Sequence, residues 1–538
     1  MFRLCVMSML AAVLSCGAVV QADSSGATER PNVILIMADD MGFCDLGCYG
    51  GEIRTPHLDA LAKDGLRFTQ FYNTARCCPT RASLLTGLYS HQAGMGCMVG
   101  DYGLPAYQGS LNKQCVTIAE VLKQGGYQVF MSGKWHVGEE HPSWPVDRGF
   151  DRYFGLISGA CNFFRLAPGR MMAMDNEPWK PEGDDFYMTD AITDYAIKFL
   201  KASAKKRDPF FLYVAYTAPH FPLHARAEDI EAYKGVYDCG WDVLRQRRYR
   251  RLVELGLIDP GCALSPRDSD VPAWKDVEDK AQQSLKMAVY AAQITSMDQG
   301  IGRIMHQLDA MGLEGNTIVM FLSDNGGASA EIDAGKPGAP AGHPDSYMTV
   351  GRGWANASNT PFRLFKRYVH EGGILTPLVV RWPNVIKGGR ISGQVGHVID
   401  LMATCADVAG VQYPQTYGGE RITPLEGESL LPVLQGRPVQ GDRTLFWEHE
   451  GHQAVRRGKW KLVSQEHGRW ELYDLEVDRS ELHDLSKERP ALVQSLMKEY
   501  KGWAKRCGVV PFHTLPGKSN VIPWYRLPLE ERTKLMNW

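Results

Sequence analysis

The sequence predicts an α/β sandwich with a large, mostly parallel central sheet and a smaller C-terminal region. Four continuous apolar runs are typical of strands buried on both faces, as in a parallel sheet. Segments with helical spacing lie between these runs, and this alternation indicates helices packed on both faces of the sheet. A hydrophobic content of 44% over 538 residues is enough to form a large core, which excludes wholesale disorder.

Each of the four predicted strands ends at polar residues. The strands span residues 33–37, 127–131, 210–216 and 318–322, and the side chains that follow them are, in order, Asp39 and Asp40, Lys134 and His136, His220, and Asp324 and Asn325. In open α/β sheets, ligands bind beyond the carboxyl ends of the strands. Any one of these groups could be an ordinary turn, but four such ends together predict a site at this edge.

Two helices are clearly marked between the strands. Thr117 and Glu120 form a capping box at the start of the first helix, and Gly125 follows its end. Apolar residues from Met287 to Leu308 recur at helical spacing, which predicts a long helix directly before the fourth strand.

A third helix is predicted to begin at a cysteine. In residues 77–87, Pro79 fits the first helical turn and Gly87 fits the C-terminal stop. Cys77 therefore lies at a helix N-terminus, where backbone N–H groups favour anions, and Arg81 can point toward the same place. A thiol in this position would be reactive. The alternative is a buried or disulfide-bonded cysteine.

The polar residues at the strand ends are suited to a hard cation and an anionic ligand. Three carboxylates and an amide oxygen suit Ca²⁺ or Mg²⁺ better than zinc, because no matching set of Cys and His accompanies them. A lysine and two histidines beside such a cation would suit an anionic, oxygen-rich ligand. Phosphate and sulfate esters are the obvious candidates.

Charge and the N-terminal segment limit the class of protein. The 59 basic and 61 acidic residues give a net charge of −2, which offers no reason to propose nucleic acid as a partner. Residues 1–22 have the pattern of a secretory signal, with Arg3, an apolar run and Ala22 at the cleavage site. We therefore expect a periplasmic or secreted protein without a transmembrane segment in the mature chain. The alternative is a lipoprotein attached through Cys16.

Eleven of the 13 cysteines lie beyond residue 22, so at least one cannot pair within the chain. An oxidising compartment permits disulfides, but their pairing cannot be derived from the sequence. Cys44 and Cys48 are better interpreted as core or disulfide cysteines than as zinc ligands, because no second pair with zinc spacing follows them.

The segment Cys-x-Pro-x-Arg followed by Leu-Thr-Gly resembles the signature of the type I sulfatases, and in particular of bacterial arylsulfatase-like members. Cys77 is the matching cysteine, Cys78 fills the variable position, and Thr80 stands where serine is more usual. Further blocks resemble the family in the same order along the chain. They are residues 31–40, 133–136, 218–220, 323–326 and 359–366, with 371–373 after them.

The resemblance implies an alkaline-phosphatase-like sandwich and a modified nucleophile. Cys77 would be oxidised to formylglycine by a maturation enzyme, which leaves ten cysteines, and the hydrate would attack sulfur. Asp39, Asp40, Asp324 and Asn325 would hold Ca²⁺ together with the modified Cys77, and Mg²⁺ is the less suitable ion.

The resemblance also implies roles for the basic residues. Arg81 would hold the hydrate, and Lys134 and Lys366 would bind sulfate oxygens. His220 would protonate the leaving ester oxygen. His136 would take a proton from the second hydroxyl, so that sulfate is expelled and the aldehyde is restored. His136 or His220 could instead simply bind sulfate.

The remaining sequence predicts the surroundings of the site. We expect a catalytic domain over residues 23–430 and a C-terminal subdomain with its tail over 431–538, containing a short antiparallel sheet and a helix at 491–505. The loop at 448–452 and residues 347–359 are expected to reach the mouth of the site. We interpret residues 226–257 as a solvated helical excursion, because acidic residues flank its basic stretch, and the alternative is a groove for a sulfated polymer. His224 and His370 are expected at the surface or behind the site residues.

The leading interpretation is a secreted sulfatase that hydrolyses sulfate monoesters of a glycan terminus or small molecule, with carbohydrate sulfates favoured over aryl sulfates. One alternative is a phosphomonoester or phosphonate hydrolase on the same scaffold. Another is a catalytically silent binder of sulfated glycans, should Cys77 remain unmodified.

Overall fold

The structure is a computed structural model that describes residues 30–516, apart from residues 184, 207, 438 and 440. The predicted signal segment, Cys16 and the tail beyond residue 516 lie outside the described residues. Among the described residues, no helix combines the length and apolar character needed to cross a bilayer.

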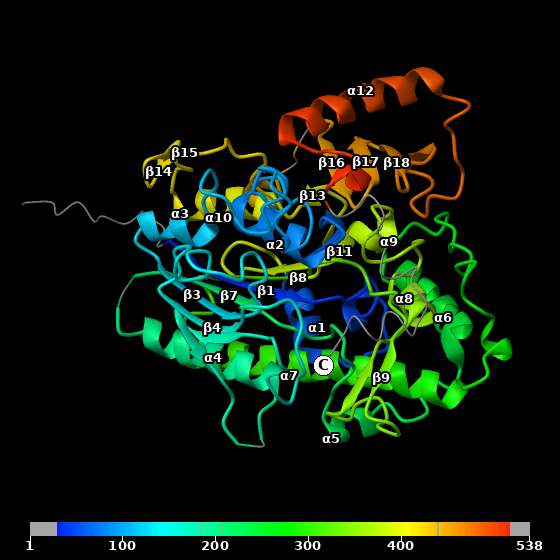
Figure 1. Ribbon diagram of the computed structural model, residues 1–538, viewed down its shortest axis with the longest axis horizontal. Helices are drawn as coiled ribbons and strands as arrows, with labels where there is room; N and C mark the ends of the chain where they lie inside the picture. Colours follow the sequence, from blue (N-terminus) through cyan, green and yellow to red (C-terminus); the bar gives the residue numbers. More distant parts are fainter. Residues whose placement is uncertain (1–29, 184, 207, 438, 440, 517–538) are drawn as a thin grey trace, which may run out of the picture.

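The four predicted strands form the centre of one large sheet (Figure 1). They are β1 (Asn32–Ala38), β3 (Gln128–Gly133), β7 (Phe210–Ala215) and β8 (Thr317–Ser323), each within two residues of its predicted bounds. They lie side by side in the order β8-β1-β7-β3, and all three pairings are parallel. Their carboxyl ends therefore meet at one edge, as the sequence predicted.

Antiparallel strands extend this parallel centre, so the sheet of eleven strands is mixed. On one side, β11 (Leu375–Arg381) runs antiparallel to both β8 and β2 (Leu66–Tyr72). The other strands of the sheet are β4 (Arg152–Leu156), β5 (Met172–Met174), β6 (Glu177–Trp179), β12 (Arg390–Ser392) and β13 (Gly396–His397).

Helices cover both faces of the large sheet (Figure 1). The side chains of β1 alternate: Val33, Leu35 and Met37 belong to one buried cluster, and Ile34 and Ile36 belong to the other. The first cluster includes residues of α2 (Cys77–Thr86), α3 (Ile118–Gln124) and α10 (Asp400–Ala409). The second includes residues of α1 (Pro56–Lys63), α4 (Met188–Ser203) and α7 (Lys280–Ala310).

The predicted helix signals are confirmed. Thr117 and Glu120 form the capping box of α3, with Gly125 after its last residue. Gly87 follows α2 in the left-handed region, with φ 70°, which glycine adopts without strain. The apolar spacing from Met287 to Leu308 lies within α7.

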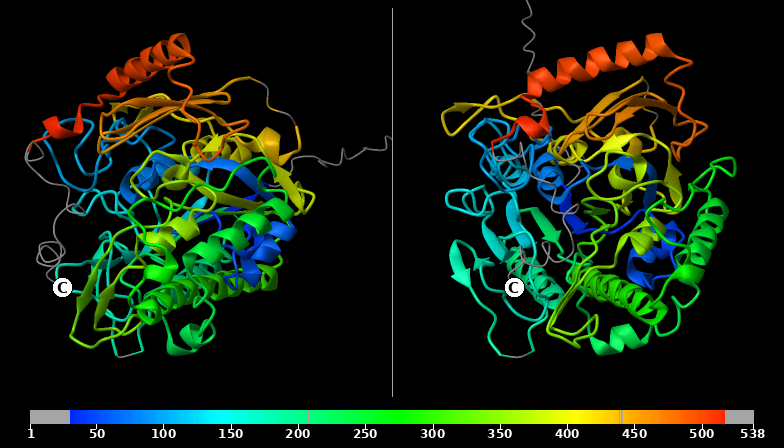
Figure 2. Two further views of the ribbon diagram at one scale, coloured as in Figure 1. Left: turned by 90° about the vertical axis from the view of Figure 1, so that its right-hand side faces the viewer. Right: turned by 45° about the vertical axis from the view of Figure 1, so that its right-hand side comes forward.

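The C-terminal part forms the expected small layer beside the large sheet (Figure 2). Its antiparallel strands are β16 (Thr444–His449), β17 (His452–Arg457), β18 (Trp460–Ser464) and β19 (Trp470–Asp474), and α12 (Pro490–Cys507) packs on this sheet. The predicted domain boundary at residue 430 stays a prediction.

The remaining helices and strands complete the described chain. They are α5 (Ala227–Glu231), α6 (Gly240–Glu254), α8 (Arg352–Ser358), α9 (Glu371–Ile374), α11 (Leu431–Leu434), β9 (Asp333–Gly335), β10 (Ser346–Met348), β14 (Thr416–Tyr417), β15 (Glu420–Arg421) and the 3₁₀ turns Gly47–Tyr49, Trp274–Asp276 and Phe512–Thr514.

One sequence expectation is wrong, and one of two alternatives is excluded for a pair of histidines. The basic helix α6 is not simply solvated, because Arg245 and Arg248 are buried; Arg248 forms ion pairs with Asp45 and Glu52, at 2.7 and 2.8 Å. His224 and His370 are both fully buried, which excludes the surface alternative and leaves the position behind the site residues. His224 Nε2 lies 2.9 Å from the carbonyl oxygen of Ser346, the first residue of β10.

No disulfide joins any two of the eleven described cysteines. Cys44 is a core residue and Cys48 is half-buried, which supports the core interpretation of this pair over the disulfide one.

Candidate active site

All ten site residues predicted from the sequence lie together at the carboxyl edge of the parallel strands, and all ten are buried. Asp39 and Asp40 follow β1, Asp324 and Asn325 follow β8, and His220 follows β7. The remaining five are Cys77 and Arg81 on α2, Lys134 and His136 after β3, and Lys366 in the loop before α9.

The backbone at the ends of β1 and β3 is held in an unusual conformation. Asp40 and His136 have φ angles of 71° and 59°, in the left-handed region that non-glycine residues seldom adopt. The Asp40 backbone N–H donates to Oδ1 of Asp324 at 3.2 Å, and that of Met41 donates to Oγ of Ser323 at 3.0 Å. Such strain persists only where surrounding contacts impose it and is concentrated at functional sites.

The acidic residues present a set of oxygens suited to a cation. Within the described part of the chain, Asp39 Oδ1, Asp40 Oδ2 and Asn325 Oδ1 are buried and accept no hydrogen bond. Buried acceptors without partners are rare and costly. Burial raises the pKa of Asp39 above its ordinary value, and burial together with Asp39 raises the pKa of Asp324 to about 8. These residues therefore fit a hard divalent ion, whose charge would stabilise their ionised forms.

Three cationic side chains surround these carboxylates. Arg81 donates to Asp324 Oδ2 from Nη2 at 2.9 Å and from Nε at 3.2 Å. Lys134 Nζ lies 2.5 Å from Asp39 Oδ2, and Lys366 Nζ forms an ion pair with Asp40 Oδ1. Although burial alone would raise the pKa of Asp40, His220 and Lys366 hold it below its ordinary value.

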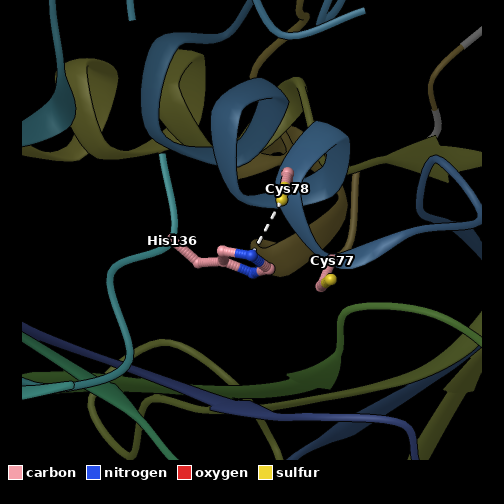
Figure 3. A group of neighbouring side chains, drawn as sticks. All are labelled: Cys77, Cys78 and His136. Atoms are coloured by element: carbon pink, nitrogen blue, oxygen red, sulfur yellow. Dashed lines mark hydrogen bonds between the residues drawn. The ribbon is translucent and has the colours of Figure 1, made fainter. Parts of the chain in front are cut away.

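Cys77 is the first residue of α2, as the sequence predicts, and its side chain is 2% exposed. A hydrogen bond from the Cys78 thiol lowers the pKa of Cys77 well below its ordinary value, and the charges of Lys134 and Lys366 add to this effect. Cys78 Sγ also lies 3.3 Å from His136 Nε2, so the imidazole lies beside both cysteines (Figure 3).

Both histidines of the site favour their neutral forms. Burial lowers the pKa of His136 and that of His220 to about 4. His220 Nδ1 lies 2.6 Å from the carbonyl oxygen of Phe221, which fixes the proton of the neutral ring on that nitrogen. Its Nε2 lies 3.5 Å from Asp40 Oδ2, a carboxylate oxygen that opposes the effect of burial and favours the protonated ring.

The site opens into a cavity of about 530 Å³. Cys77, His136, His220 and Lys366 are among the residues that line it. Four further lining residues are charged and had no predicted role: Arg76, Glu139, Arg170 and Glu331. Apolar and aromatic side chains also line the cavity, among them Met98, Val99, Phe221 and Tyr368. Scattered loops contribute them, so no local sequence signal marks them as a group.

One expectation about the mouth of the site is confirmed, and a second holds only as a contact behind the cavity wall, since none of residues 448–452 lines the cavity. Tyr347 and Arg352, from the segment 347–359, line the cavity. The hairpin between β16 and β17 reaches the cavity wall, because Glu450 forms a buried ion pair with Arg367, which also lines the cavity. The small C-terminal sheet thus supports one wall of the site.

Two family models match the chain. The model of the sulfatase family matches residues 31–411, which include every site residue described above. The model described as N-sulphoglucosamine sulphohydrolase, C-terminal, matches residues 362–504, which include Lys366 and the small sheet.

Individual proteins show the same similarity. An uncharacterized sulfatase of Schizosaccharomyces pombe is 33% identical over 475 residues, covering 81% of this chain and 86% of that protein. An arylsulfatase of Klebsiella aerogenes is 34% identical over 431 residues, covering 75% and 92%. A crystal structure of Ps i-CgsB in complex with k-i-k-neocarrahexaose matches with a TM-score of 0.67 and 25% identity, covering 88% and 93%.

Proposed function

The chain belongs to the sulfatase family and is a sulfuric ester hydrolase, and from this premise we propose that it cleaves the S–O bond of sulfate monoesters at an oxidised Cys77 beside a bound Ca²⁺. One observation supports the proposal above all. The reactive position at the start of α2 and the three unpartnered oxygens of Asp39, Asp40 and Asn325 belong to the same buried group of side chains.

Asp39, Asp40, Asp324 and Asn325 would hold the ion. Their oxygens are the hard donors that Ca²⁺ prefers, and a larger ion tolerates the irregular arrangement of such loops better than Mg²⁺ does. When bound, the ion would supply a positive charge that polarises the sulfate oxygens. Arg81 holds Asp324 through two hydrogen bonds and so fixes one of these carboxylates in place.

Formylglycine at residue 77, in its hydrated form, would supply the nucleophilic oxygen. Lys134 forms an ion pair with Asp39, and Lys366 forms one with Asp40. Each ammonium group can still turn one hydrogen toward a sulfate oxygen. Fixed charges in a site that excludes water stabilise developing negative charge more strongly than they would in solution. The backbone N–H groups at the start of α2 favour an anion at the same place.

The two histidines would handle the protons. His220 would donate one to the leaving ester oxygen, and an arriving sulfate ester would favour the charged ring that this step needs. His136 lies beside residue 77 and would remove a proton from it to release sulfate. Its neutral form, which burial favours, is the form that a base requires.

The natural substrate would be a carbohydrate sulfate, with aryl sulfates as further substrates. The similar Ps i-CgsB structure was solved with neocarrahexaose. The cavity also combines aromatic groups with charged side chains, a combination that suits the apolar faces and the hydroxyl groups of a sugar. Secretion through residues 1–22 and conversion of Cys77 by a maturation enzyme are parts of the same proposal.

Isotope-labelled water tests the bond that is cleaved. If the enzyme cleaves S–O, hydrolysis in ¹⁸O-water places the label in released sulfate and leaves the alcohol unlabelled. Label in the alcohol would contradict the proposal. Parallel assays with matched sulfate, phosphate and phosphonate esters separate the sulfatase from the alternative hydrolases. Protein from the native host that keeps the thiol at Cys77 and binds sulfated glycans without turnover would identify a silent binder.

A further inference from the structure

Three side chains near the active-site cavity form a compact group of soft ligands. Cys78 Sγ lies 3.3 Å from His136 Nε2, and the ligand atoms of Cys77, Cys78 and His136 all lie within 4.8 Å of one another. All three residues are buried. Figure 3 shows both cysteines at the start of α2, with the imidazole lying beside them from the segment that follows β3.

The protein holds these ligands in place before any ion arrives. The two cysteines occupy the first helical turn of α2, and His136 is fixed by its left-handed backbone. Gly159 packs against the ring so closely that an added Cβ would lie 2.2 Å from Nε2. Ligands of a tetrahedral zinc ion lie about 3.5–3.8 Å apart, as follows from Zn–S and Zn–N bond lengths. The observed spacing needs only small side-chain adjustments to match this.

This group differs in chemistry from the oxygens proposed to hold Ca²⁺. Thiolates and imidazole favour zinc and similar soft ions, whereas carboxylate and amide oxygens favour calcium. Within the described residues, Cys77, Cys78 and His136 are also one of just two groups whose Cys, His, Asp or Glu atoms are spaced for a metal ion. The other group is Asp39, Asp40 and His220.

We propose that chains whose Cys77 keeps its thiol bind one Zn²⁺ between Cys77, Cys78 and His136, with a fourth position open to the cavity. On binding, the two S–H bonds are replaced by S–Zn bonds and two protons pass to solvent, without any oxidant. The bound ion occupies the place where the ester would react. The unconverted chain is then held in an inert, metal-bound form.

Conversion of Cys77 to formylglycine removes one of the two sulfur ligands, so the converted chain loses this site. That contrast rests on the proposed function, whereas zinc binding by the unconverted chain does not. The structure thereby assigns a role to Cys78, which the sequence analysis placed in a variable position of the motif. Cys78 makes the unconverted site a three-ligand site instead of a two-ligand one.

The test uses full-length protein made in cells that lack a maturation enzyme, with the thiol at residue 77 confirmed by peptide mass. The protein is titrated with Zn²⁺, and separately with Co²⁺ as a spectroscopic substitute, in excess Ca²⁺ to fill the oxygen site. We expect one equivalent of Zn²⁺ and a thiolate-to-cobalt charge-transfer band. Cys78→Ser should weaken Zn²⁺ binding by about 100-fold or more, because it removes a direct ligand.

Cys239→Ser is the matched control. Cys239 is half-buried, lies directly before α6 and belongs to neither metal group. It should bind Zn²⁺ like the unaltered chain. The proposal is overturned if Cys78→Ser, shown to be folded by its circular dichroism, keeps the same affinity and cobalt band, or if the unconverted chain binds no Zn²⁺. If fully converted protein bound Zn²⁺ as tightly as the unconverted chain, the proposed loss of the site would be refuted. The proposed function would still be tested separately by the sulfatase assay.

Discussion

Replacing Lys461 by methionine tests how the small sheet is joined to the catalytic part of the chain. Lys461 lies on β18 with no exposed surface, and its Nζ is 2.7 Å from Glu371 Oε1 and 2.8 Å from Glu481 Oε1. Glu371 belongs to α9, shortly after the segment that carries Lys366. Lys461 thus forms ion pairs with two buried carboxylates at the junction of the two parts.

The burial of this ion pair sets how much stability the chain should lose when Lys461 is replaced. Methionine fills similar space but leaves the two carboxylates without their cation, and removing one partner of a buried ion pair costs about 3–5 kcal/mol. We expect Lys461→Met to lower the free energy of unfolding by about that amount, measured by urea titration with tryptophan fluorescence. Lys459→Met is the control, since Lys459 is more exposed and pairs with Asp474 and Glu476 at the surface, so it should change stability little.

The stability of Lys461→Met should also depend on pH differently from that of the unaltered chain. In the unaltered chain, Lys461 holds the pKa of Glu371 below its ordinary value against the opposing effect of burial, so this contribution to stability is lost as pH falls. Without the lysine, the pKa of Glu371 rises toward the value that burial favours, although Arg456 and Arg479 still oppose this rise. Lowering the pH should then restore part of the stability of Lys461→Met. Equal stability of Lys461→Met and Lys459→Met at neutral pH would refute the reasoning.

Three further predictions concern the site and the core. Asp324→Asn should bind Ca²⁺ at least about 10-fold more weakly by equilibrium dialysis, because a ligating carboxylate is lost; unchanged affinity would place the ion elsewhere. Gly159→Ala should lower kcat about 100-fold with little change in melting temperature, since its Cβ would displace the His136 ring; normal turnover would show that the position of the ring is unimportant. Burial raises the pKa of Asp298 from 3.8 to about 7, so the folded chain keeps a proton that the unfolded chain releases and stability falls as pH rises between these values. Asp298→Asn should flatten that slope in urea titrations, and an unchanged slope would contradict the assignment.

The central strands could be predicted because burial on both faces leaves a simple signal. β1, β3, β7 and β8 are continuous apolar runs, and each stops where polar residues begin. β11 carries a weaker signal, because Pro377 interrupts it. The pairing of β11 with β2 shifts register between Thr376 and Leu378, so the proline sits at an irregularity that the sequence does not reveal.

The site residues could be found from the sequence because parallel strands bring their carboxyl ends together, and because the motifs resemble a known family. Their individual contacts could not be found in this way. Lys134 and Lys366 contact Asp39 and Asp40 directly, which depends on side-chain packing between distant segments. The burial of Arg248 was missed for the same reason, since its partners lie near residue 50.

In the proposed mechanism, turnover depends on the chemical state of residue 77. Protein preparations with different degrees of conversion can be made by varying the supply of a maturation enzyme. The peptide that contains residue 77 reports the converted fraction, because the aldehyde is about 18 Da lighter than the thiol. We predict that kcat for a sulfate ester rises in proportion to this fraction and extrapolates to zero for the pure thiol. Full turnover by protein that carries only the intact thiol would contradict the account.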